Sequence, residues 1–291
     1  AKLFSDYGAQ VFNFEPQEGF LTRRIKPLIP GTQESAMHGY LNANKMSVTG
    51  VSHSELEHVD LVIYDQNVTA INEKELKTNS NAISWFGKSG PYSKFKGSDA
   101  MIQSLIGKII GIGPPEGPPI IPTGYQTQIL GGLTAYIGSL GHLLGNSLQD
   151  DQESFHLDTS IYEASMCLTD MAILYADSQG AITPRLGINR FAPTYPLGVF
   201  PCKDGWLGVT VLSPSQWESF CKLLDLKELS DTPLFHSSMN RLEAIDLIEP
   251  LILEKLKDRS AEELFYEGQQ ARVPLARVPT MDELFKVDQY L

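Results

Sequence analysis

The chain has 291 residues, 42% of them apolar and 20% charged, which is typical of a globular protein with one large or two medium domains. Its formal net charge of −12 argues against nucleic acid as the main partner, because neutralising phosphates requires a basic surface. The apolar run from Ile129 to Leu144 is shorter than the roughly 20 residues that span a bilayer, so we expect a buried helix and no membrane association. Three cysteines without paired spacing favour free thiols in a cytoplasmic protein.

The first part of the chain predicts short apolar strands that alternate with helices. A short helix over residues 3–8 precedes the first strand, and a Gly/Pro-rich loop over 111–124 precedes a long helix from about Ile129. Further helical periodicity covers 161–176. The predicted strands lie at residues 10–14, 61–64, 82–86 and 155–158. This alternation favours an α/β fold with a parallel, doubly wound sheet, and we expect a large domain over residues 1–177.

The composition changes after this domain. Residues 178–196 are rich in Gly and Pro, and we interpret them as a linker. Residues 197–212 predict a β-hairpin that turns at residues 203–205. Ser213 then begins a helix with capping-box spacing and a proline at the first helical position. We therefore expect a smaller α+β domain over residues 197–291.

Six segments, all in the same order and spread over most of the chain, carry a resemblance to a known family. They are residues 6–16, 42–48, 87–99, the helix around Gln128, residues 203–217 and residues 273–278. Together they resemble the family III CoA-transferases, which include formyl-CoA and carnitine CoA-transferases and α-methylacyl-CoA racemases. The resemblance implies a Rossmann-type large domain with a smaller α+β domain, and two chains interlocked as a homodimer or heterodimer. It also implies CoA or acyl-CoA as the ligand, with no covalently bound cofactor.

Gln128 occupies the position at which the resemblance predicts a catalytic aspartate. The family pattern is Asp, three residues and Gly, and Gly132 matches that glycine. In active members the carboxylate attacks the acyl-CoA carbonyl to form a mixed anhydride, which released CoA converts to an aspartyl-CoA thioester. A neutral amide is no such nucleophile. We therefore expect an inactive site in a chain that serves as the partner of an active subunit or domain. The alternative is an active acyl-CoA:carboxylate CoA-transferase that uses another carboxylate, and Asp99 is the nearest by sequence.

The racemase branch of the family requires acid–base groups that this chain lacks. The positions that match those groups are Ser98, Gln128 and Ser213, and none of the three side chains titrates near neutral pH. We therefore expect no racemase activity. Asp99 has a second interpretation, as the N-cap of its own helix, which requires no catalytic role.

The resemblance also assigns positions that bind CoA. Arg23 and Arg24 match the family's early arginine segment, and Lys45 matches its Asn-x-x-Lys motif, so that fixed cations would meet the phosphates. Gly131 and Gly132 would allow close approach of the ligand to the long helix. The alternative interpretations are solvated surface charge for the three cations and helix packing for the glycines.

Several departures from the family pattern affect binding as well as catalysis. Met46 replaces a second basic residue, and residues 65–69 lack the arginine of the family's Asn-Phe-Arg-Pro-Gly loop. The family pattern also includes a strand before Ala1 and a segment after Leu291. The six histidines show no metal-ligand spacing, so we expect no metal site.

Overall fold

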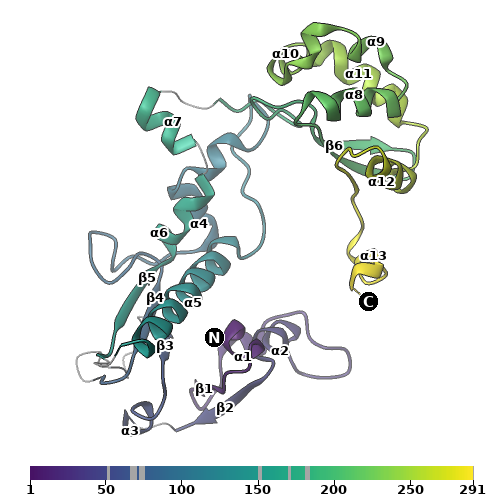
Figure 1. The fold of residues 1–291 in the computed structure, drawn as a ribbon. Helices are drawn as coiled ribbons and strands as arrows, with labels where there is room; N and C mark the ends of the chain where they lie inside the picture. Colours follow the sequence, from purple (N-terminus) through teal and green to yellow (C-terminus); the bar gives the residue numbers. More distant parts are fainter. Residues whose placement is uncertain are drawn as a thin grey trace. The chain divides into compact units, whose positions relative to one another are not determined.

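The computed structural model describes residues 1–50, 53–65, 71, 76–149, 153–169, 172–180 and 184–290 (Figure 1). Two compact units make up the chain. The N-terminal unit comprises residues 1–110 and 120–183, and the C-terminal unit comprises residues 111–119 and 184–291. The Pro-rich segment 111–119 thus leaves the first unit, joins the second and returns before the long helix begins.

The N-terminal unit begins with a two-stranded parallel sheet. Strands β1 and β2 pair with Val11 opposite Lys45 and Glu15 opposite Thr49. A helix joins them, as parallel pairing requires, and Ser35 caps this helix by accepting a hydrogen bond from His38 N. The elements are α1 (Lys2–Asp6), β1 (Val11–Glu15), η1 (Leu21–Arg24), α2 (Ala36–Asn42), β2 (Lys45–Thr49) and α3 (His53–Leu56).

A second parallel sheet has three strands in the order β3-β4-β5. These are β3 (Val62–Asp65), β4 (Ser80–Ser84) and β5 (His156–Ser160). The α/β class and the parallel pairing predicted from the sequence are confirmed. Among the described residues, however, the strands form two sheets where the sequence predicted one, because apolar patterning identifies strands but does not specify which edges pair.

The helices of this unit differ in extent from the predicted ones. The long helix begins at Gln126, three residues before the predicted start. The predicted helix over 161–176 consists of shorter helices on either side of residues 170 and 171, and these two residues lie outside the described ones. The elements are α4 (Asp99–Leu105), η3 (Lys108–Gly111), α5 (Gln126–Ser147), α6 (Ile161–Ser165), η4 (Met166–Thr169) and α7 (Ala172–Gln179). Within the described ranges, no helix combines the length and apolar character needed to cross a membrane.

Helix α5 contacts β4 and β5 through a face of small residues. Its buried positions recur every four residues and are Thr127, Gly131, Ala135 and Ser139. The fully buried Asn81 of β4 donates from Nδ2 to Ala135 O at 3.2 Å and to Ser139 Oγ at 3.0 Å, and its Oδ1 accepts from Thr159 Oγ1 at 2.8 Å. Because small side chains let the backbone approach, one asparagine can hold this helix and β5 together.

The C-terminal unit is an antiparallel sheet with helices, and the predicted hairpin is confirmed. The elements are β6 (Leu197–Cys202), β7 (Gly205–Thr210), α8 (Pro214–Leu223), α9 (Lys227–Ser230), η5 (Pro233–His236), α10 (Ser238–Glu243), α11 (Ile245–Leu256), α12 (Ala261–Gln270), β8 (Leu275–Arg277), α13 (Met281–Leu284) and η6 (Asp288–Tyr290). The predicted capping box at Ser213 is also confirmed, because its Oγ accepts from Gln216 N and Gln216 Oε1 accepts from Ser213 N.

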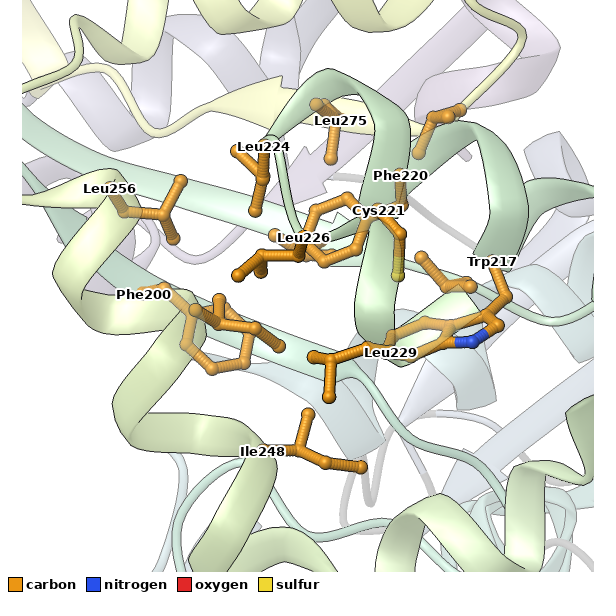
Figure 2. Packing of buried hydrophobic residues seen from close by; sticks show 14 of the residues in the cluster. Phe200, Trp217, Phe220, Cys221, Leu224, Leu226, Leu229, Ile248, Leu256 and Leu275 are labelled. Carbon is orange, nitrogen blue, oxygen red and sulfur yellow. The ribbon is translucent and has the colours of Figure 1, made fainter. Parts of the chain in front are cut away.

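The core of this unit is apolar, and Figure 2 shows the side chains of α8 and α11 converging in it. The labelled members are Phe200, Trp217, Phe220, Cys221, Leu224, Leu226, Leu229, Ile248, Leu256 and Leu275. One cation is buried beside them. Arg241 donates from Nε to Tyr195 O at 2.6 Å and from Nη1 to Phe235 O at 2.7 Å, with its Cζ 4.8 Å from the Trp217 ring. Arg241 therefore links the segment before β6 to η5 and α10.

Candidate functional site

Gln128 lies in the first turn of α5 and is partly buried. Its Oε1 is buried, and the side chain makes no hydrogen bond to any described residue. The first turn of a helix favours negative charge, because its backbone N–H groups are unpaired and the helix dipole is positive there. The position would therefore stabilise a carboxylate, but the side chain present is a neutral amide.

Asp99 contacts Thr127, the chain neighbour of Gln128, and both oxygens of its carboxylate accept structural hydrogen bonds. Oδ1 accepts from Thr127 N at 2.8 Å and from Thr127 Oγ1 at 2.7 Å, while Oδ2 accepts from Gln103 Nε2 at 2.5 Å. The expectation that Asp99 caps its own helix is wrong. Ser98 caps α4 by accepting from Met101 N, and Asp99 instead holds the start of α5. A cap that comes from a distant segment leaves no pattern in the residues next to the helix, so the sequence did not indicate it.

The two glycines assigned to CoA binding differ in their surroundings. Gly131 is buried, and a Cβ atom there would lie 2.7 Å from Ile161 Cγ1, so packing against α6 accounts for this glycine. At Gly132 a Cβ atom would meet nothing within 4 Å. CoA contact by either glycine stays a prediction.

The loop after β4 is held at the carboxyl edge of the three-stranded sheet. Lys88 donates from its backbone N to Asp158 Oδ2 at 2.7 Å and from Nζ to Tyr64 OH at 3.2 Å. Lys88 was not predicted as a site residue, although its place directly after a strand is a signal. Ligands of α/β proteins bind beyond the carboxyl ends of parallel strands, so this edge is a second candidate region.

A polar cavity of about 150 Å³ lies within the N-terminal unit. Its lining residues come from β1, η1, α2 and β2 and are Asn13, Glu15, Arg23, His38, Gly39, Asn42, Lys45 and Ser47. The structure thus brings together Arg23 and Lys45, two of the three predicted CoA-binding cations. Arg24 does not line the cavity, and its Nη2 donates to Glu18 O at 2.7 Å.

Glu15 and Arg23 form a two-pronged ion pair at this cavity. Arg23 Nε lies 2.6 Å from Glu15 Oε2, and Arg23 Nη2 lies 2.7 Å from Oε1. The Arg23 hydrogen bond, assisted by Phe20 N and Ser47 Oγ, lowers the pKa of the Glu15 carboxyl from 4.5 to about 2. The positive charge of Arg23 and the negative charge of Glu15 cancel. Arg23 Nη1, however, has no hydrogen-bond partner in the described part of the chain. Arg23 is therefore oriented by Glu15 and can still donate to a ligand.

Lys45 supplies the cavity with its net positive charge. Its Nζ donates to Asn42 Oδ1 at 3.1 Å, and burial, followed by repulsion from Lys2, lowers the pKa of its ammonium group. His38 completes the lining, and burial followed by repulsion from Arg23 lowers its pKa. A partly buried ammonium group with several neutral donors around it can hold one anionic group.

Other positions singled out in the sequence have structural roles or lie outside the described residues. Ser98 and Ser213 both cap helices, and Met46 is an exposed residue of β2. Asp65 ends β3, and residues 66–69 of the altered loop are outside the described residues. In the described part of the chain, His, Cys, Asp and Glu form no group of three or more that could hold a metal ion.

Comparison with known proteins establishes the family. The sequence model of CoA-transferase family III matches residues 80–291. The chain belongs to this family, as the six segments indicated.

Two relatives and one solved structure illustrate the similarity. A probable CoA-transferase of Mycobacterium tuberculosis is 24% identical over 320 residues, which cover 99% of this chain and 39% of that protein. The human succinyl-CoA:glutarate CoA-transferase is 26% identical over 309 residues, covering 98% of this chain and 69% of that protein. The crystal structure of a CAIB/BAIF family protein from Brucella suis superposes with a TM-score of 0.84 at 22% identity, covering 99% of this chain and 82% of that one. The last similarity shows the fold alone.

Proposed function

We propose that this chain binds acyl-CoA thioesters but is catalytically inactive at its own α5 site, and that it acts as the partner of an active CoA-transferase subunit or domain. The observation that carries the proposal is the side chain of Gln128, a neutral amide at a helix start that would stabilise an anion. Acyl transfer through a mixed anhydride needs a carboxylate oxygen as nucleophile, and an amide cannot supply it.

The geometry of Asp99 argues against the alternative, an active transferase that uses this carboxylate. Three hydrogen bonds occupy its two oxygens, and two of the three come from the buried Thr127. An attack on an acyl-CoA would compete with these bonds and weaken the hold of Asp99 on the α5 N-terminus. Transferase activity of the purified chain that is lost in a folded Asp99→Asn variant would favour the alternative.

The cavity supports the CoA-binding part of the proposal. Pockets that enclose a whole small-molecule ligand measure roughly 300–1,000 Å³, so a cavity of about 150 Å³ fits one charged group of a larger molecule. Lys45 Nζ and Arg23 Nη1 are suited to a phosphate of CoA. The relatives that are named as CoA-transferases point to the same ligand class.

An exposed apolar face on α5 supports the partner role. Ile129, Ile137 and Leu144 are 66%, 60% and 57% exposed, and Leu133 and Leu148 extend the same face. A helix of a soluble protein normally directs its large aliphatic residues inward. Here the inward face is made of small residues, so the outward face is suited to cover by another chain. We propose a homodimer or heterodimer, with the Rossmann-type domain interlocked as in the family.

Restoring the carboxylate tests the proposal. The Gln128→Asp variant, incubated with an acyl-CoA, is expected to form a covalent adduct that mass spectrometry detects, whereas the wild type forms none. Gln126→Asp is the matched control, because it adds the same charge to the same helix turn two residues away.

Calorimetry with CoA separates binding from chemistry. CoA binding by the wild type without an adduct in Gln128→Asp would mean that the site has lost more than its nucleophile. An adduct or steady turnover in the wild type would overturn the proposed inactivity, and absence of CoA binding would overturn the ligand assignment.

A further inference from the structure

His38 lines the polar cavity without belonging to any motif recognised in the sequence. It lies near the start of α2, where its Nδ1 is 2.8 Å from Thr22 Oγ1 and 3.1 Å from Asn42 Nδ2. The orientation of the Asn42 amide follows from Lys45, because an ammonium group can only donate and therefore faces Oδ1. Asn13 Nδ2 donates to the same oxygen at 2.8 Å.

This orientation places a donor, Asn42 Nδ2, beside the His38 ring. Asn42 Nδ2 can only donate, and it also donates to His38 O at 3.1 Å. When His38 Nδ1 accepts from Asn42, the ring proton of the neutral imidazole lies on Nε2. Nε2–H has no hydrogen-bond partner anywhere in the described ranges. His38 therefore adds to the cavity lining a ring nitrogen that is left for a ligand, beside Lys45 and Arg23.

Charged groups on several elements around the ring set its protonation. Arg23 on η1 and Lys45 on β2 disfavour the imidazolium, and Glu15 on β1 and Glu34 before α2 favour it. Burial, the largest influence, disfavours it as well. An unprotonated Nδ1 can accept from Asn42 Nδ2, which favours the neutral form in the same direction as burial.

We infer that His38 is a ligand-contacting residue that gains a proton when a phosphate group enters this cavity. The phosphate brings negative charge beside two cations that otherwise repel the imidazolium. Protonated Nδ1 then donates to Thr22 Oγ1 and gives up the Asn42 bond, while Nε2–H donates to the phosphate. The proton comes from solvent, so binding strengthens as pH falls. That the phosphate belongs to CoA rests on the proposed function, but the charge argument for the cavity does not.

The test is an NMR titration of the His38 Cε1–H signal, assigned by its loss in His38→Gln. The probes are buffer alone, inorganic phosphate and CoA. A negative charge within 4–6 Å shifts a pKa by about one unit or more, so we expect at least that rise for His38 with either probe. His58→Gln provides the control, because His58 is exposed and lies outside the cavity, and it should leave the His38 shift unchanged.

Calorimetry supplies the second measurement. As pH falls from 8, CoA affinity is expected to rise more in the wild type than in His38→Gln, and a one-unit pKa rise makes this difference approach about tenfold only below the His38 pKa of the free protein. Protons that bind to the CoA phosphates themselves affect the wild type and the variant equally, so they cancel when the two affinity changes are compared.

The outcomes separate this inference from the proposed function. A rise with inorganic phosphate but not with CoA would support the inference and count against CoA as the ligand. No rise with either probe would overturn the inference, even if CoA binds elsewhere on the chain.

Discussion

The start of α5 and the cavity beside β1 differ in how they use charged groups. At α5, a position that would stabilise an anion holds the neutral Gln128, and the nearby carboxylate of Asp99 is engaged in capping. At the cavity, Glu15 orients Arg23, and Lys45 remains as the net charge. Among the described residues, the first region offers a neutral amide and a carboxylate engaged in capping, whereas the second places an ammonium and a guanidinium group at a cavity. Binding and catalysis therefore have separate requirements, and our proposal is that this chain meets those for binding alone.

The largest effect is expected from overfilling the contact between α5 and α6. Gly131→Leu forces a side chain into the space of Ile161, and overpacking of this kind costs about 3 kcal/mol of unfolding free energy. Gly132→Leu, one residue later with open space around it, is expected to be neutral or slightly stabilising. Urea unfolding followed by circular dichroism measures both. Equal destabilisation would show that α5 does not pack in this way.

The next effect concerns the ion pair at the cavity. Glu15→Gln is expected to lower the unfolding free energy at pH 7 by about 2 kcal/mol, because it removes a buried charged partner of the half-exposed Arg23. The pKa of Glu15 is lowered to about 2, so its contribution is full above 4.5 and disappears as pH falls from 4.5 toward 2.

The wild type and the Glu15→Gln variant should therefore converge in stability at acidic pH. Glu18→Gln, an exposed neighbour, serves as the control. A stability difference that persists unchanged at pH 2 would contradict the ion-pair explanation.

Lys45→Gln tests the binding half of the comparison. Loss of the Lys45 ammonium group from the cavity lining should weaken CoA binding about tenfold, with little change in stability. Arg24→Gln, outside the cavity, should change affinity less than twofold by the same calorimetric measurement. If both variants weaken binding equally, CoA is held by diffuse surface charge and not by this cavity.

The smallest effect is expected for Asp99→Asn, about 1 kcal/mol of unfolding free energy, because the change removes a negative charge from the start of α5 and one of the acceptors for Thr127 and Gln103. Asp60→Asn, on an exposed residue, is the control for the loss of one negative charge. Unchanged stability would mean that the Asp99 carboxylate is not needed as a cap, and would restore it as a candidate nucleophile.

Local features of the sequence predicted much of the fold. The hairpin, the capping box at Ser213 and the apolar spacing that buries Trp217 and Phe220 are all encoded within a few neighbouring residues. The early start of α5 was missed because its cap, Asp99, lies 28 residues before Thr127.

The same limit applies to the cavity. The sequence singled out Arg23 and Lys45, but neither the pairing of Arg23 with Glu15 nor the place of His38 was visible. These features depend on the parallel pairing of β1 with β2, which brings Ser47 and Glu15 together across 32 residues. Patterning therefore identified charged residues, whereas tertiary structure determines which of them can meet a ligand.

The segment 111–119 has a consequence for dissecting the protein. It belongs to the C-terminal unit, where Pro115 lies against Gly187, although the chain around it belongs to the N-terminal unit. A fragment that starts at residue 184 would lack this piece and expose the surface beneath it. Cleavage by a protease near residue 180 would leave the piece on the other fragment, so the two products should stay associated through it. Separate expression of the C-terminal unit therefore calls for a circularly permuted or spliced gene in place of a simple truncation.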